Sequence, residues 1–105
     1  MASAMVTTTA YEMTAEVWRS DGPGDRYFVT LPDDVAQAVR EKFGGSHQAV
    51  GSLPVSVALG KSIWSTSLYA DNASNSYVIA IKDDVRRREL VREGQVISLR
   101  FAVKR

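Results

Sequence analysis

The chain has 105 residues, of which 45% are hydrophobic and 24% charged, and it contains no cysteine and a single histidine, His47. This length fits one domain with a modest core, and the composition is that of a soluble globular protein. The lack of cysteine excludes a disulfide scaffold, a thiolate nucleophile and a cysteine zinc site, and one histidine cannot build a histidine-based metal site. We therefore expect no metal and no cofactor.

The charge balance argues against a dedicated nucleic-acid-binding protein, which usually has a clear basic excess. The formal net charge is +1, from 13 basic and 12 acidic side chains. Residues 1–50 carry four basic and seven acidic side chains, net −3, whereas residues 51–105 carry nine and five, net +4. This modest asymmetry leaves nucleic-acid binding possible but disfavoured.

The N-terminal segment MASAMVTTTA lacks the basic and apolar regions of a secretory signal. We expect residues 1–11 to be a flexible tail and residues 12–105 to form a single domain. No apolar run approaches the roughly 18 residues that a membrane-spanning helix needs. A cytoplasmic protein that does not enter a membrane is the expected class.

The first two predicted elements are strands. Residues 12–20 and 26–31 alternate apolar and polar side chains, and the turn-forming sequence DGPGD separates them. This arrangement predicts a β-hairpin between the two strands.

A short helix is predicted next, over residues 32–43, because the apolar period changes to that of a helix. Asp33 or Asp34 would cap its first turn, and Gly44-Gly45 would end it. Its apolar face is formed by residues four apart: Val35, Val39 and Phe43.

The second half repeats this alternation of strands and helix. Gly60-Lys61 predicts a tight turn between two of the strands, and residues 82–91 predict a second short helix. Four strands are expected here, over residues 53–59, 62–68, 77–81 and 96–104. The last one should place one set of alternate residues in the core: Ile97, Leu99, Phe101 and Val103.

An internal repeat links the two halves. Residues 27–44, YFVTLPDDVAQAVREKFG, align without a gap on residues 77–94, YVIAIKDDVRRRELVREG. Both segments contain a strand, an Asp pair, a short helix and a glycine. Two such units related by a pseudo-two-fold axis could close one small barrel and remove exposed strand edges.

The sequence resembles a bacterial family of domains of unknown function, number 1905, from Met13 onwards. The resemblance rests on MTAEVWRSDGPGDRYFVTLPDDVA, LPVSVALGKSIWSTSLYA, SYVIAIKDDVR and EGQVISLRF. The segment from Val78 to Leu99 also resembles the swapped-hairpin element of AbrB and MazE proteins. The resemblance implies a mainly β fold: a double-split, AbrB-like barrel of about six strands with two short helices in one chain. It implies no activity, and Leu90 stands where the family commonly has glycine.

The basic cluster formed by Arg86, Arg87 and Arg88 is the first candidate site. An AbrB-type DNA-binding dimer presents such residues from both halves, but the repeat aligns these three with uncharged residues 36–38. We expect Asp83 to pair with Arg87 and Asp84 with Arg88, which favours a solvated, salt-bridged helix over a phosphate-binding one. Arg86, which belongs to the family pattern, would anchor the helix or line a ligand site.

The sequence SIWSTSL contains the second candidate site. A tryptophan beside hydroxyl groups, as in Trp64, Thr66 and Ser67, could bind a small ligand by stacking and hydrogen bonding. The alternative is a tryptophan packed in the core, with Thr and Ser chosen because they fit a strand.

Catalytic signatures are missing from the sequence, which has no Gly-x-Ser-x-Gly elbow, phosphate loop or dinucleotide fingerprint. We predict a non-enzymatic binding or interaction module, monomeric or weakly dimeric, for an unassigned small ligand or protein. Its ligand-binding residues would be Arg86, Trp64, Thr66 and Ser67. The alternative is an AbrB-type nucleic-acid-binding protein that uses four basic residues: Lys82, Arg86, Arg87 and Arg88.

Overall fold

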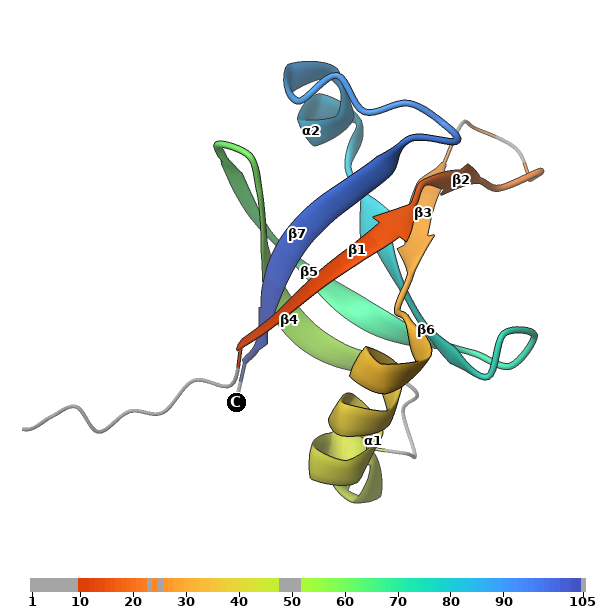
Figure 1. The fold of residues 1–105 in the computed structure, drawn as a ribbon, viewed down its shortest axis with the longest axis vertical. Helices are drawn as coiled ribbons and strands as arrows, with labels where there is room; N and C mark the ends of the chain where they lie inside the picture. The colour runs from red at the N-terminus through yellow and green to blue at the C-terminus, as the bar shows by residue number, and fades with distance from the viewer. Residues whose placement is uncertain (1–9, 23, 25, 48–51, 105) are drawn as a thin grey trace, which may run out of the picture.

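Alternating apolar residues form strands along most of the chain in the computed structural model, which describes residues 10–22, 24, 26–47 and 52–104. Seven strands and two helices follow one another in this part of the chain (Figure 1): β1 Ala10–Glu16, β2 Trp18–Arg19, β3 Tyr27–Thr30, α1 Asp33–His47, β4 Ser52–Leu59, β5 Ser62–Asp71, β6 Ser76–Ile81, α2 Asp83–Arg88 and β7 Val96–Val103. β1 thus begins two residues before the predicted domain boundary. Neither described helix has the length and apolar character needed to cross a membrane.

The strands form one antiparallel sheet in the order β1-β7-β4-β5-β6-β3-β2. Its two edge strands, β1 and β2, are separated in the sequence by Val17 alone. The sheet must therefore curl so that its two edges approach each other at Val17. Val17 accepts a hydrogen bond from the Gly94 N–H (2.8 Å) and donates one to the Gln95 carbonyl (2.9 Å), both in the segment that precedes β7. The result is the predicted mainly β, barrel-like fold with two short helices (Figure 1).

The strand order has a two-fold pattern. When β1 and β2 are counted as one strand, the order closes into a ring. Exchanging that strand with β5, β3 with β6, and β4 with β7 gives the same ring read in the opposite direction. Val29 lies opposite Ile79 in the β3–β6 pair, and these are residues that the sequence repeat aligns. Seven strands are observed instead of about six because the first predicted strand is interrupted at Val17.

The predicted hairpin between the first two strands is largely wrong. Only β2 pairs with β3, through Trp18 opposite Phe28 and Arg19 opposite Tyr27. β1 pairs along its whole length with β7, at the other end of the chain. A local turn signal cannot reveal this pairing, because β7 lies at the far end of the chain: Glu16 pairs with Val96 and Ala10 with Ala102.

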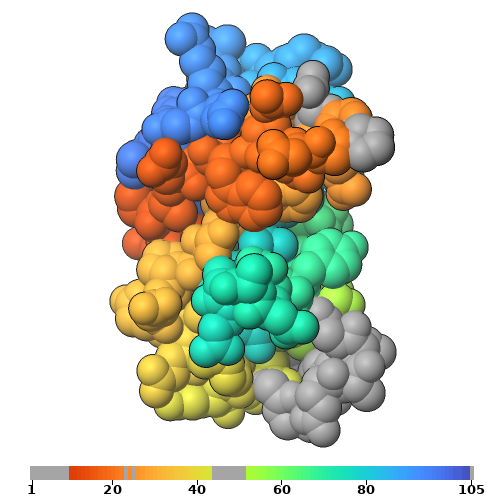
Figure 2. All heavy atoms as spheres, turned by 90° about the vertical axis from the view of Figure 1, so that its right-hand side faces the viewer, coloured from red at the N-terminus to blue at the C-terminus, as the bar shows by residue number. Residues whose placement is uncertain are grey.

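The core fills the barrel and extends under α1. The four residues of β7 that were predicted to face inward are all buried. From α1, Val39 and Phe43 are buried and Val35 is partly buried against them, as the helical spacing predicted. Figure 2 shows one side of the molecule, with α1 (yellow) at the lower left, the β2–β3 segment (orange) above it, the β5–β6 turn (turquoise) in the centre, and α2 with the segment that follows it (blue) at the top.

Both helix ends differ from the prediction. α1 continues past Gly44-Gly45 to His47, because glycine disfavours a helix by only about 1 kcal/mol and does not forbid it. α2 ends at Arg88, earlier than predicted, because Leu90 adopts a left-handed conformation with φ 57°. The Val91 N–H then donates to the Arg86 carbonyl at 2.9 Å, which closes the helix end.

The acidic pair at the start of α2 does not provide a side-chain cap. The residue at the cap position is Lys82, which makes no side-chain capping hydrogen bond. Asp83 and Asp84 lie in the first turn, and Asp84 Oδ1 accepts a hydrogen bond from the Val85 N–H at 2.9 Å. Carboxylates in this turn still interact favourably with the positive end of the helix dipole.

Candidate functional site

A hollow of about 310 Å³ lies where β3, β6 and the start of α2 meet. The pairing of β3 with β6 places Tyr27 opposite Ile81, and α2 begins directly after β6. These neighbours bring basic, acidic and aromatic side chains to one place. We call it the Tyr27 hollow, and its lining residues are Gly24, Arg26, Tyr27, Ala80, Ile81, Lys82 and Asp83.

Arg86 contacts two residues of the Tyr27 hollow. Its guanidinium carbon lies 4.3 Å from the centroid of the Tyr27 ring, and its Nη2 lies 3.7 Å from Asp83 Oδ1. Its Nε is buried and has no hydrogen-bond partner among the described residues. A guanidinium over a phenol ring contributes about 0.5–2 kcal/mol, so Arg86 helps to hold α2 against β3 and retains an unused donor.

A second set of polar contacts holds α2 against the β4–β5 turn. Glu89 Oε2 accepts hydrogen bonds from the Ser62 hydroxyl (2.7 Å) and the Lys61 N–H (3.1 Å). Arg88 Nη1 donates to the same Ser62 hydroxyl at 2.9 Å, and Arg88 also lies 3.7 Å from Asp84. Ser62 is only 2% exposed. We call this arrangement of Lys61, Ser62, Arg88 and Glu89 the α2 clip.

Gly60 makes the α2 clip possible. It has φ 58°, a conformation that favours glycine, and a β-carbon at this position would collide with the Glu89 carboxylate. The turn therefore requires glycine for two reasons, its backbone conformation and the close approach of Glu89.

The predicted ion pairs of α2 are partly observed. Asp84 pairs with Arg88, as predicted. The predicted partner of Asp83 was wrong. Asp83 pairs with Arg86, three residues further along the helix, and not with Arg87, which is four residues away. Residues three and four apart are both neighbours on a helix, and the Tyr27 ring fixes Arg86 on the nearer side. Within the described part of the chain, Arg87 and Lys82 are exposed and form no ion pair.

The second predicted site is divided between two faces of β5. Trp64 is 7% exposed and belongs to the core, where its Nε1 has no hydrogen-bond partner among the described residues. Thr66 shares its face and is half-buried, whereas Ser67 points to the opposite face because side chains alternate along a strand. None of these residues lines either hollow described here.

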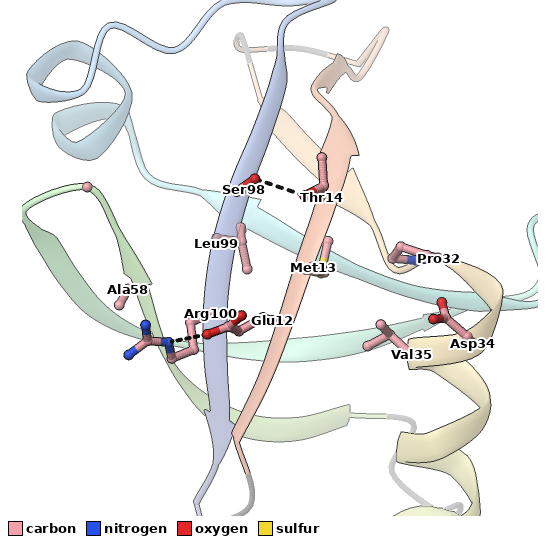
Figure 3. Close-up of a pocket in the computed structure, with 11 residues that line it drawn as sticks. Glu12, Met13, Thr14, Pro32, Asp34, Val35, Ala58, Ser98, Leu99 and Arg100 are labelled. Carbon is pink, nitrogen blue, oxygen red and sulfur yellow. Dashed lines mark hydrogen bonds and ion pairs between the residues drawn. The ribbon is translucent and has the colours of Figure 1, made fainter.

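A larger hollow of about 690 Å³ lies over β1 and β7, and we call it the β1 groove. Figure 3 shows Pro32, Asp34 and Val35 on its α1 side, and Ala58 and Arg100 toward the β4–β5 hairpin. The remaining lining residues come mainly from the two strands: Glu12, Met13, Thr14, Gly60, Ser98 and Leu99.

Two side-chain pairs cross the β1 groove. Glu12 Oε2 lies 3.5 Å from Arg100 Nε, and the Thr14 and Ser98 hydroxyls are 2.8 Å apart (Figure 3). Sequence reasoning missed this groove because Glu12 and Thr14 look like the ordinary solvent face of a strand. The pairing of β1 with β7, on which the groove depends, has no local sequence signal.

The described residues contain no group of three or more His, Cys, Asp or Glu side chains that could hold a metal ion. Burial raises the pKa of the Tyr11 phenol, whose ring stacks on Phe101 with centroids 5.1 Å apart. Tyr11 lines neither hollow.

The sequence profile of DUF1905, a domain of unknown function, matches residues 14–101. The chain belongs to the DUF1905 family. The predicted resemblance to the DUF1905 family is therefore confirmed. The match covers both helices and all strands except the outer ends of β1 and β7. No sequence among curated proteins matches the chain.

Proposed function

We propose that this DUF1905 protein is a non-enzymatic binding module that takes a small organic anion in the Tyr27 hollow. The observation that carries the proposal is the buried Arg86 Nε, which has no hydrogen-bond partner among the described residues. Arginine binds carboxylates and phosphates through charge-assisted hydrogen bonds, and an unpaired buried donor costs free energy. An anion in the hollow would be attracted by the Arg86 charge, since Arg86 contacts the lining residues Tyr27 and Asp83 without lining the hollow itself.

The charges around the hollow support an anionic ligand. Arg26 and Lys82 line the hollow, and Arg86 lies behind it in contact with the lining residues Tyr27 and Asp83. Asp83 is the one carboxylate among the described lining residues, and its 3.7 Å contact with Arg86 is longer than a good hydrogen bond. A volume of about 310 Å³ lies at the small end of the range for ligand sites, which suits a compact anion.

The test is a titration of ¹⁵N-labelled protein with phenyl phosphate and with benzoate, followed by amide chemical shifts. We expect the shifts to concentrate at Tyr27, Lys82 and Asp83. Lys82→Gln should weaken binding several-fold, whereas Arg100→Gln, which removes the same charge from the β1 groove, should leave it unchanged. Shifts spread over the surface, or equal effects of the two substitutions, would refute the proposal.

A second candidate function is nucleic-acid binding by α2, and the exposed Lys82 and Arg87 favour it. Against it, Arg86 and Arg88 are engaged with Asp83 and Asp84. A labelled 20-mer duplex should then bind with an affinity that falls steeply between 50 and 200 mM salt. The slope of log affinity against log salt concentration should be roughly −1 for each phosphate contacted. No anisotropy change at low salt would remove this candidate, and a change that persists in Lys82→Gln/Arg87→Gln would assign it to another surface.

We further propose that the barrel arose by joining two AbrB-like halves in one cytoplasmic chain. The two-fold strand order and the Val29–Ile79 pairing support this proposal. A chain that holds both halves closes its barrel without a partner. Light scattering should therefore give a mass near 11.5 kDa at micromolar concentration, and a stable dimer would count against the proposal.

A further inference from the structure

Three planar side chains lie in contact with one another beside the Tyr27 hollow. The Trp18 ring stacks on the Phe28 ring, with centroids 4.9 Å apart and planes inclined by 27°. The guanidinium carbon of Arg26 lies 5.6 Å from the centroid of the same Phe28 ring. Arg26 is exposed and lines the hollow, whereas Trp18 and Phe28 do not line it. Of the three planar groups, which we call the Trp18–Phe28–Arg26 stack, the Arg26 guanidinium is therefore the one that a ligand in the hollow can reach.

The strand register explains why this stack reaches the hollow. Arg26 precedes β3 and Lys82 follows β6, and because the two strands are antiparallel these residues lie at the same end. Side chains alternate along a strand, so Arg26 and Lys82 share the face that carries Phe28 and its paired residue Ala80. The β2–β3 segment is open to view in Figure 2 (orange). The Arg26 end of the stack and the Lys82 ammonium thus border the same hollow.

The lining of the hollow combines cations with uncharged surface. Arg26 and Lys82 form no ion pair with another described residue. The uncharged lining residues are small or largely apolar: Gly24, Tyr27, Ala80 and Ile81. An inorganic anion would leave this surface in contact with water, whereas an anion with an apolar part would cover it. A flat ring suits the site, because a guanidinium is planar and stacks on aromatic faces.

We propose that the anion bound in the Tyr27 hollow carries an aromatic ring. The ring stacks on the Arg26 guanidinium and extends the Trp18–Phe28–Arg26 stack, while the anionic group pairs with the Lys82 ammonium. This inference rests on the proposed function and narrows its ligand from small organic anions in general to aryl phosphates and aryl carboxylates. Phe28 is a positioning residue, because it holds the Arg26 plane without touching the ligand.

Three phosphate monoesters separate the contribution of the ring from that of the charge. Phenyl, cyclohexyl and methyl phosphate carry the same anionic group, and each is titrated into the full ¹⁵N-labelled chain with amide shifts as the readout. We expect phenyl phosphate to bind roughly fivefold more tightly than either of the others, because the cyclohexyl group has the size of the ring but no aromatic face. Equal affinities of phenyl and cyclohexyl phosphate would overturn this inference and leave the proposed anion site intact. No binding by any of the three would refute the proposed function and this inference with it.

Arg26→Lys tests the planar guanidinium, since it keeps the positive charge and removes the flat stacking surface. The ratio of the phenyl phosphate affinity to the methyl phosphate affinity should fall to about one. Arg26 is exposed, so the variant should fold, and its amide spectrum checks this. Arg100→Lys makes the same substitution in the β1 groove and should leave the ratio unchanged. A ratio that persists in Arg26→Lys would overturn the inference.

Phe28→Leu tests the ring that supports Arg26. Without this ring the guanidinium is less well held, and the preference for phenyl over cyclohexyl phosphate should fall roughly twofold. Tyr69→Leu is the matched control, because Tyr69 is 49% exposed on β5 and lines neither hollow. Equal effects of the two leucine substitutions would contradict the positioning role of Phe28.

Discussion

The two helices pack against the barrel in different ways although the repeat aligns their sequences. Ala36 and Val39 of α1 are 2% and 0% exposed and lie in the core. Their aligned partners, Arg86 and Glu89, lie over the Tyr27 ring and on Ser62. Equivalent positions are thus used for apolar burial in one half and for polar contacts in the other. The hollow with basic lining residues, the Tyr27 hollow, lies beside α2.

The two kinds of contact should respond differently to substitution. A charged side chain cannot replace a buried apolar one without a large loss of stability, because an unpaired buried charge raises the free energy of the folded state. The α2 clip is partly buried, and it can lose one hydrogen-bonding member at lower cost because its other members and water replace part of what is lost. Exchanging residues between the helices tests this contrast directly.

The largest effect is expected for Val39→Glu, which places the α2 residue at the equivalent position of α1. Val39 is fully buried, and burying a carboxylate there should lower the free energy of unfolding by about 3 kcal/mol or more. Urea denaturation measures the change. Ala38→Glu, on the exposed face of the same helix, is the control and should be near neutral. A loss below 1 kcal/mol would mean that α1 is not part of the cooperative core.

Gly60→Ala should destabilise by about 2 kcal/mol, because alanine is strained at φ 58° and its methyl group displaces Glu89. Combining it with Glu89→Ala separates the two causes. The cost of Gly60→Ala should fall by about half in that background, as a double-mutant cycle would show. Full additivity would exclude the contact with Glu89.

Glu89→Val, the reverse exchange, should cost only about 1 kcal/mol. Ser62 keeps its hydrogen bond from Arg88, and the Lys61 N–H is exposed enough to bind water. Thermal unfolding measures this change, and Glu93→Val, which removes a carboxylate outside the clip, provides the comparison. A cost as large as that of Val39→Glu would remove the contrast between the two helices.

The smallest effect, and one of opposite sign, is expected for Leu90→Gly. Leu90 is 74% exposed and has φ 57°, so glycine relieves backbone strain with little loss of burial. The gain should be about 0.5 kcal/mol, visible as a higher urea midpoint. Leu90→Ala keeps the strain and should not be stabilising.

Local patterns in the sequence predicted the secondary structure and little of its assembly. The alternation in β7 identified its four buried residues, and the spacing in α1 identified Val39 and Phe43. The pairing of β1 with β7, on which the β1 groove depends, links segments that no local pattern connects. The candidate residues around Trp64 show the same limit. A tryptophan followed by Ser and Thr gives the same local sequence pattern whether it packs in the core or binds a ligand.

Arg86 shows how far the repeat could lead. Its alignment with Ala36 indicated that the basic cluster has no counterpart in the other half. The alignment could not indicate that Arg86 would select Asp83 and the Tyr27 ring, because that choice depends on β3 lying beside β6.

The pairing of the first and last strands also has a consequence for how the protein is made. Thr14 and Ser98, which share a hydrogen bond, are 84 residues apart in the sequence. Contacts of such high sequence separation slow folding, because a long loop must close before they stabilise anything. During synthesis β1 therefore has to wait for β7 to leave the ribosome. Until then its whole length is an unprotected strand, which is the period in which misfolding or premature association is most probable.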